Sequence, residues 1–215
     1  MYTFLIIIFI LVLLIRFRHT KIKIKTFFRK GFAPKRGKFG VYCYCGKQGS
    51  GKTYSAVEFL LNNSNLPIFS NVHLKNIKYT YFKGFNSLLD LRDQKDCIIV
   101  YDEIFTALTK SSKINSDVLD FLSQMRKRRI IFITTAQEWL EINITLRRYC
   151  RYQIECKMLN LLGLGILIKA MYDAELLKWS NEDNEYIAPL IETTISKCNI
   201  RVANSYDTFE QIKTS

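Results

Sequence analysis

The sequence predicts an α/β fold, a three-layer sandwich in which helices cover both faces of a mostly parallel sheet. Short apolar runs typical of buried strands, such as 97–101 and 130–134, alternate with segments of helical spacing, such as 54–61 and 116–126. The first strand leads through a glycine-rich segment, 46–53, directly into a helix. Alternation of this kind favours a parallel sheet, because parallel strands need crossover connections that are usually helical.

The segment that joins the first strand to the first helix carries the most specific motif. Residues 39–45 are rich in aromatic and β-forming side chains, and residues 54–62 repeat apolar side chains at spacings of three and four. Between them the chain reads Gly46-Lys47-Gln48-Gly49-Ser50-Gly51-Lys52-Thr53, which has the spacing G-x-x-x-x-G-K-T. This is the spacing of a phosphate-binding loop, whose glycines let backbone N–H groups approach phosphate oxygens at the start of a helix. Lys52 supplies a charge for the β- and γ-phosphates of ATP, and the Thr53 hydroxyl can bind Mg²⁺.

Three less regular elements follow. The chain predicts a strand at 67–73, a hairpin-like or edge segment at 77–82, and a short helix at 86–91. They continue the alternation of strands and helices on which the parallel sheet rests.

An acidic pair stands at the end of the next strand, 97–101. Ligands of open α/β sheets bind at the carboxyl ends of strands, so Asp102 is positioned to hold Mg²⁺ together with Thr53. Glu103 beside it is the natural general base for an attacking water. This pairing indicates hydrolysis of ATP more than phosphate transfer to a small molecule. The alternative, two solvated acids at a strand end, is disfavoured by the phosphate loop upstream.

Four consecutive cations separate the next helix, 116–126, from the strand 130–134. Ser116 is a candidate cap for this helix. The cations are Arg126-Lys127-Arg128-Arg129. One interpretation is that they stabilise a helix C-terminus; the other is that Arg126, Arg128 or Arg129 is an arginine finger for the ATP of a neighbouring subunit. Beyond the strand, Gln137 can hydrogen-bond the γ-phosphate or the attacking water.

The pattern changes toward the C-terminus. Segments 149–159 and 166–172 flank Gly163 and Gly165, and they predict two antiparallel strands that form a β-hairpin extension. The residues beyond Trp179 are polar and loosely patterned, which favours a tail outside the core.

The N-terminal segment is apolar. Residues 1–15 carry no charge and are mostly Ile, Leu, Phe and Val. As a helix they would cover about 22 Å, which is less than the ~30 Å hydrocarbon core. Phe17 and the snorkelling side chains of Arg16 and Arg18 would extend this length. The sequence therefore predicts an N-terminal transmembrane helix, with a helix lying in the membrane interface as the alternative.

Positive charge gathers just after this apolar run. Of the 32 Lys and Arg residues, ten lie within 16–38, and the first acidic residue of the chain is Glu58. The rest is nearly balanced, with 22 basic against 19 acidic residues, so the net charge of +13 does not by itself indicate nucleic-acid binding by the core. The positive-inside rule predicts a single-pass membrane protein with its N-terminus outside and its body in the cytoplasm.

A chain of 215 residues suits one α/β core with extensions and is too short for two full domains. We therefore expect four parts, namely a transmembrane anchor over 1–17, a basic juxtamembrane linker over 18–38, an ATPase domain with its hairpin over 39–178, and a polar tail over 179–215.

Taken together, these motifs resemble the FtsK–HerA class of DNA-pumping ATPases. The similar pieces are 42–53, Ser70-Asn71-Val72-His73-Leu74, Tyr101-Asp102-Glu103, 124–137 and Leu146-Arg147-Arg148. Within this class the chain is similar to the zonula occludens toxin-like family, which includes filamentous-phage assembly ATPases, and to the genome-packaging ATPases of membrane-containing viruses. In the phage assembly ATPases the membrane segment usually follows the ATPase region, whereas here the apolar run precedes it.

The resemblance implies a membrane-anchored ATPase that uses ATP and Mg²⁺, assembles with copies of itself, and moves DNA in phage or virus assembly or extrusion. Its expected partners are DNA, the membrane, and virion or extrusion-complex proteins. The alternatives are a motor that packages a genome into a preformed capsid, a nucleotide-switched membrane adaptor, and a small-molecule kinase. A kinase is disfavoured because the chain has no evident lid or acceptor-binding motif.

Overall fold

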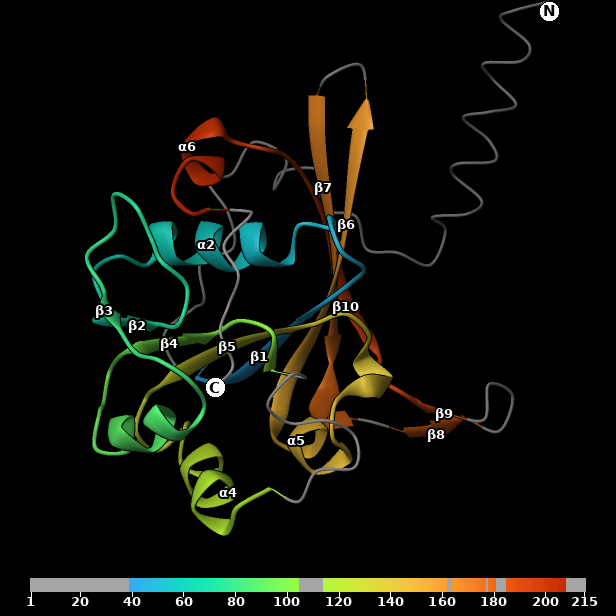
Figure 1. The fold of residues 1–215 in the computed structure, drawn as a ribbon. Helices are drawn as coiled ribbons and strands as arrows, with labels where there is room; N and C mark the ends of the chain where they lie inside the picture. Colours follow the sequence, from blue (N-terminus) through green and yellow to red (C-terminus); the bar gives the residue numbers. More distant parts are fainter. Residues whose placement is uncertain (1–38, 105–113, 162–163, 177, 181–184, 208–215) are drawn as a thin grey trace, which may run out of the picture.

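The computed structural model describes residues 39–104, 114–161, 164–176, 178–180 and 185–207. In these residues one eight-stranded sheet has the order β10-β7-β6-β1-β5-β4-β2-β3 (Figure 1). Its strands are β1 (Gly40–Cys45), β2 (Ile68–Ser70), β3 (Thr80–Tyr81), β4 (Ile98–Tyr101), β5 (Ile131–Ala136), β6 (Cys150–Leu161), β7 (Leu164–Asp173) and β10 (Leu190–Lys197). All neighbours from β6 to β3 pair in parallel, and β7 runs antiparallel to β6 and β10. The predicted mostly parallel sheet is confirmed.

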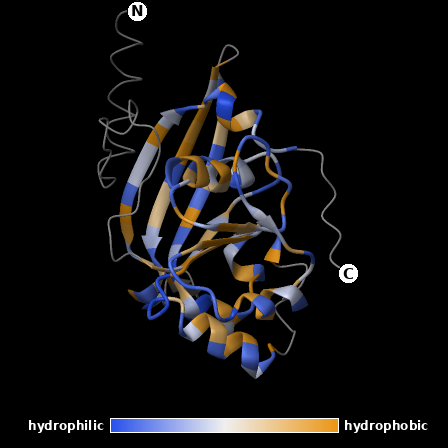
Figure 2. Cartoon of the chain, turned by 90° about the vertical axis from the view of Figure 1, so that its left-hand side faces the viewer, coloured by the Kyte–Doolittle hydropathy of each residue, from blue (hydrophilic) through white to orange (hydrophobic). Residues whose placement is uncertain are grey.

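Helices cover both faces of this sheet (Figure 1). One face carries α2 (Lys52–Asn62) and α6 (Ile200–Ala203), and the other carries α4 (Ser116–Ser123), α5 (Ile144–Tyr149) and the 3-10 helix η2 (Asn86–Leu91). Of two further 3-10 turns, η3 (Trp139–Glu141) lies between β5 and α5, and η4 (Ala174–Leu176) follows β7. Strand side chains alternate between the faces, so β1 feeds two separate hydrophobic cores. Figure 2 shows hydrophobic residues concentrated in the central strands and hydrophilic ones along the loops.

Several local boundaries differ from the sequence prediction. The strand expected at 67–73 is limited to the three residues of β2. Of the two alternatives for 77–82, the edge segment is confirmed: strand β3 is limited to Thr80–Tyr81 and pairs with β2 in parallel, so it is not a hairpin arm. The cap of α4 is Asn115 and not Ser116, because the Asn115 side chain accepts a hydrogen bond from the Asp117 N–H at 3.0 Å while Ser116 is already helical.

The C-terminal region is part of the main sheet. The root of β6 pairs with β1, so the hairpin is an extension only beyond Glu155, where it rises past α2 (Figure 1). The stretch expected as a polar tail supplies the small β8–β9 ribbon (Lys178–Ser180 and Glu185–Ile187), strand β10 and helix α6. Strand β10 covers the edge of β7 and buries polar residues such as Thr193 and Thr194. Because these buried residues are polar, the hydropathy of the sequence does not indicate a strand here.

The predicted transmembrane helix at 1–17 and the basic linker at 18–38 lie outside the described residues. Within the ranges that the structure covers, no helix is both long and apolar enough to cross a membrane.

Candidate active site

The phosphate loop begins where β1 ends and is fastened to the end of β5. The Gly46 N–H lies 3.2 Å from the Ala136 carbonyl oxygen and 3.0 Å from that of Gln137. Both Gly46 (φ 147°) and Gly51 (φ 87°) have backbone angles that disfavour any side chain. A Cβ atom on Gly46 would lie 2.6 Å from the Cys156 carbonyl oxygen, and one on Gly51 would lie 2.8 Å from Met158 Cε. The loop therefore packs closely against the β6–β7 hairpin, with no room for a side chain at these two glycines.

Helix α2 starts from this loop without a side-chain cap. Gly51 occupies the cap position, so no capping side chain binds the first N–H groups of the helix, which suits them to phosphate oxygens. The Lys52 ammonium donates to the carbonyl oxygens of Gly46 at 2.8 Å and Lys47 at 3.2 Å. The cation thus lies over the loop, where the phosphates of a nucleotide would bind. These residues fit the predicted ATP site.

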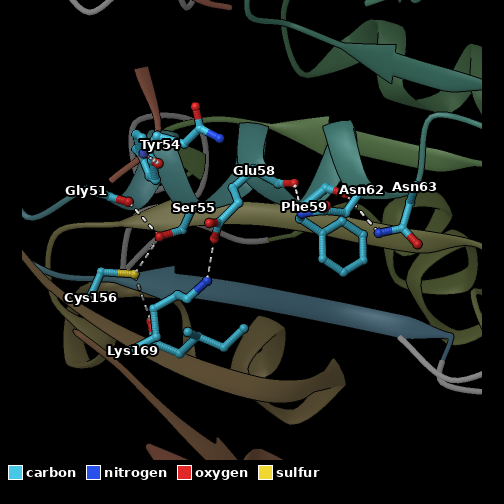
Figure 3. Close-up of polar contacts among 11 residues, drawn as sticks. Gly51, Tyr54, Ser55, Glu58, Phe59, Asn62, Asn63, Cys156 and Lys169 are labelled. Carbon is cyan, nitrogen blue, oxygen red and sulfur yellow. Dashed lines mark hydrogen bonds and ion pairs between the residues drawn. The ribbon is translucent and has the colours of Figure 1, made fainter. Parts of the chain in front are cut away.

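Polar contacts fasten α2 to the hairpin (Figure 3). Ser55 Oγ donates to the Gly51 carbonyl at 2.7 Å and lies 3.5 Å from Cys156 Sγ. One turn later, Lys169 Nζ on β7 donates to Glu58 Oε2 at 2.6 Å, and both side chains are only 10% exposed. The helix that presents the phosphate loop is therefore positioned by a buried ion pair to β7.

The acidic pair lies next to the loop, as the sequence predicts. Thr53 Oγ1 donates to Asp102 Oδ2 at 3.0 Å, across 49 positions of the chain. A carboxylate oxygen beside a hydroxyl oxygen is a suitable ligand pair for Mg²⁺. Glu103 follows in a left-handed conformation, with φ 57°, and its side chain is half-buried. Such a backbone is strained for glutamate, and it must be held by its neighbours.

Two residues that sequence reasoning did not assign hold this pair. Thr135 Oγ1 on β5 donates to Asp102 Oδ1 and accepts from the Glu103 N–H at 2.8 Å. The Asn71 side chain, just after β2, accepts from the Asp102 N–H at 2.7 Å and donates to the Asp102 carbonyl at 3.3 Å. Both are polar residues at the carboxyl ends of strands that flank β4, and that shared position was the available signal.

Burial makes both carboxyls harder to ionise. The pKa of Asp102 is raised by desolvation, against which hydrogen bonds from Thr135 and Thr53 and the charge of Lys52 act. The pKa of Glu103 is raised by desolvation and by the neighbouring Asp102, while Lys52 lowers it. A general base with a raised pKa accepts a proton more readily, which suits Glu103 to activating water.

Gln137 lies on the same edge of the sheet as the loop. Together with Gly46, Lys47, Ser50 and Trp139 it lines a groove of about 970 Å³ that continues over β6 and β7 on the face opposite α2. The Gln137 side chain is exposed, while the backbone carbonyl of Gln137 accepts from the Gly46 N–H. The structure thus brings Gln137 to the rim of the nucleotide site, and its contact with phosphate or water stays a prediction.

The arginine cluster lies at the opposite edge. Since β1 and β5 are parallel, the residues before β5 stand about 20 Å from the phosphate loop of the same chain. Arg126 pairs with Glu175, Arg129 Nε lies 2.7 Å from Asp96, and Arg128, only 23% exposed, contacts Gln124 at 3.1 Å. One of these arginines could therefore act as an arginine finger only on the ATP of a second subunit. That role stays a prediction.

Two solved structures are similar to this chain. The N-terminal domain of zonular occludens toxin from Neisseria meningitidis superposes with a TM-score of 0.53 at 18% identity, over 78% of this chain and 98% of that domain. The genome packaging NTPase B204 from Sulfolobus turreted icosahedral virus 2 gives a TM-score of 0.48 at 11% identity, over 71% of this chain and 98% of that one. Among curated protein sequences none matches the chain.

The sequence also matches a protein family. Residues 42–158, from β1 to the rising part of the hairpin, match the family described as "ATPase family associated with various cellular activities (AAA)". The matched region contains the phosphate loop, Thr53, Asp102, Glu103 and Gln137. Because the match spans more than half of the chain, the protein belongs to the AAA family and is a P-loop ATPase.

Proposed function

We propose that this ATPase couples ATP hydrolysis to the translocation of DNA during phage or virus assembly or extrusion, while anchored in a membrane by residues 1–17. The observation that carries the enzymatic part is the contact of Thr53 with Asp102 beside Glu103. The transport part is supported by the fold shared with zonular occludens toxin and by the ten cations within 16–38.

Each site residue has a chemical role in this proposal. Lys52 neutralises the β- and γ-phosphates, and Thr53 and Asp102 would hold Mg²⁺, which supplies further charge neutralisation. Glu103 accepts a proton from the attacking water. Gln137 at the rim contacts the γ-phosphate or that water.

The arginine cluster adds a second subunit to the site. Arg126 and Arg129 are the more exposed members, so either can reach across an interface if its ion pair opens. This would make the protein an oligomer whose sites are shared between neighbours.

ATP turnover by site variants tests the enzymatic part. We expect Lys52→Ala to lose ATP binding, and Glu103→Gln to retain binding while turnover falls by about 10²–10⁴, the contribution of a positioned base. If Glu103→Gln hydrolyses ATP at the parent rate, Glu103 is not the general base.

Mixing experiments test the finger. Arg126→Ala, Arg128→Ala and Arg129→Ala are each compared for turnover and for ATP affinity. A finger variant should lose turnover with its ATP affinity intact, and mixing with Lys52→Ala subunits, which carry a sound finger, should restore part of the activity. Failure of every mixture to recover would argue against a shared site.

DNA and membrane association are measured separately. Single- or double-stranded DNA should stimulate turnover at low salt, and the full-length protein should stay in membranes after alkaline extraction. Turnover indifferent to DNA and RNA would favour the nucleotide-switched adaptor. Release at high pH would place the apolar segment on the membrane surface.

A further inference from the structure

Beside the nucleotide site, the end of β2 and the edge strand β3 form a surface that the ATPase chemistry does not use. We call it the β3-edge surface; it consists of His73, Lys75, Lys78, Tyr79, Tyr81 and Lys83. Figure 1 shows β3 at the outer edge of the sheet, below α2. No further strand pairs with it among the described residues, and the side chains of both β3 residues, Thr80 and Tyr81, are exposed.

Two aromatic rings on this surface are stacked. The imidazole of His73 and the ring of Tyr81 lie 4.3 Å apart between centroids and only 5° from parallel. His73 Nδ1 lies 3.2 Å from the Tyr79 hydroxyl, which orients the imidazole. Tyr81 is 43% exposed, although tyrosine more often buries its ring. An exposed flat ring, already oriented by a stacked partner, is a platform on which another planar group can stack.

The charge around the platform is positive. Lys75, Lys78 and Lys83 are all exposed, and residues 59–89 contain no Asp or Glu. Glu58, the acid that precedes this range, is buried against Lys169. One acid borders the surface, because Asp207 follows directly on the antiparallel bridge between Leu74 and Tyr206. Lysines interleaved with exposed aromatics are complementary to phosphates interleaved with bases.

The surface is held in place from beneath. Val72, Leu74 and Phe82 are buried between the exposed positions. The Phe82 N–H donates to the Ser70 carbonyl at 3.1 Å, and the Lys75 N–H donates to the Ser205 carbonyl at 2.7 Å. Binding therefore need not order this segment first, which lowers its entropic cost.

The same segment reaches the catalytic pair. Asn71, two residues before His73, binds both backbone groups of Asp102. A ligand bound at His73 would therefore lie two residues along the chain from the side chain that fixes the position of Asp102.

From this geometry we propose that the β3-edge surface binds single-stranded nucleic acid, with a base stacked on Tyr81 and the neighbouring phosphates held by Lys75 and Lys78. In a duplex each base face is covered by its neighbours, so a lone exposed platform suits a single strand. The inference rests on the proposed DNA function and identifies the surface and the strandedness.

Fluorescence anisotropy of a labelled oligo-dT of about 15 nucleotides, with full-length protein and no nucleotide, tests the platform. Tyr81→Leu keeps the bulk and loses the aromatic face, and we expect it to weaken binding roughly 5- to 150-fold, the range for losing one stacked base. Tyr81→Phe keeps the ring and should bind like the parent. The matched control is Trp179→Leu, an aromatic that is 50% exposed on the distant β8.

Salt dependence tests the lysines. Lys75→Ala/Lys78→Ala should reduce the slope of log affinity against log salt by about 1.4, the value for two single-strand phosphates. Lys95→Ala/Lys178→Ala removes the same charge from exposed positions elsewhere and should leave the slope unchanged. Thermal melting confirms that each variant is folded.

Three outcomes overturn the inference. If Tyr81→Leu binds like Trp179→Leu, the platform carries no base. If duplex DNA competes as well as oligo-dT and depends equally on Tyr81, the surface is not specific for single strands. A parent protein that binds no oligo-dT at low salt is the third such outcome. In all three cases the proposed ATP-driven DNA transport stands as long as single- or double-stranded DNA stimulates turnover; it fails only if turnover is indifferent to DNA and RNA.

Discussion

Thr135 should control ATP turnover through two hydrogen bonds that its neighbour Thr134 does not make. Thr135 Oγ1 donates to Asp102 Oδ1 and accepts from the Glu103 N–H. Thr134 is equally buried on the same strand, yet its hydroxyl has no hydrogen-bond partner among the residues that the structure describes. Replacing each by valine changes one hydroxyl for a methyl at nearly constant volume. The two variants therefore differ in the contacts that are lost and hardly in packing.

The two variants should differ in their effect on the free energy of unfolding. A hydrogen bond to a charged group contributes about 1.5–3 kcal/mol, and an unsatisfied buried group costs about 1–3 kcal/mol. Thr135→Val loses the first and leaves the strained Glu103 N–H without its acceptor, so it should destabilise the fold. Thr134→Val removes a buried hydroxyl that has no partner, so it should be neutral or stabilising.

The same contacts set the expected effect on turnover. If the 1.5–3 kcal/mol holds Asp102 and Glu103 in place during hydrolysis, Thr135→Val should lower kcat about 10- to 150-fold. Thr134→Val should turn over ATP at the parent rate. The assay is steady-state ATPase activity at saturating Mg²⁺ together with urea denaturation of both variants. Equal kcat values for the two variants would refute the positioning role of Thr135.

Three further outcomes are expected. Burial and the neighbouring Asp102 raise the pKa of Glu103, and the base acts only when it is deprotonated. The value of kcat/KM should therefore fall as pH drops through that raised pKa, with an acid limb above the ordinary glutamate range. An acid limb at the ordinary range would mean that Glu103 is solvated. Because the pKa of Asp102 is raised in the folded protein, the folded state without nucleotide loses stability as pH rises through that pKa. Asp102→Asn should therefore raise Tm near neutral pH while ATP turnover is lost. A lower Tm would contradict this. Lys169→Met leaves the Glu58 carboxylate buried and unpaired, which should lower the free energy of unfolding by about 3–5 kcal/mol and Tm by about 6–20 °C. The double variant Glu58→Gln/Lys169→Met should recover most of this loss. A single variant as stable as the double variant would show that the ion pair is dispensable.

Local patterns in the chain were sufficient for the nucleotide site. The spacing of Gly46, Gly51, Lys52 and Thr53 requires a strand before it and a helix after it, and periodicity supplied both. Asp102 follows an apolar run, and an apolar strand of a parallel sheet must end at the ligand edge. These features depend on neighbours in sequence, so they can be recognised without the fold.

Features that depend on strand order could not be recognised in the same way. Asn71 and Thr135 meet Asp102 only because β2 and β5 both flank β4 in the sheet. The order of strands is decided by which faces bury which side chains over the whole chain. A threonine or asparagine at a strand end indicates the ligand edge of the sheet, but it does not say which strand lies beside it.

The sequence by itself determined the parallel α/β core, the phosphate loop and the acidic pair, because each is set by short-range spacing of glycines, charges and apolar residues. Only the tertiary structure decided that the polar stretch after 179 completes the sheet through β10, where Thr193 and Thr194 are buried despite their polarity. It also placed Arg126 to Arg129 at the edge away from the loop, because β1 and β5 are parallel and the loop leaves the end of β1 while the arginines lead into the start of β5. Pairing between distant strands is a property of the whole sheet, and no local pattern encodes it.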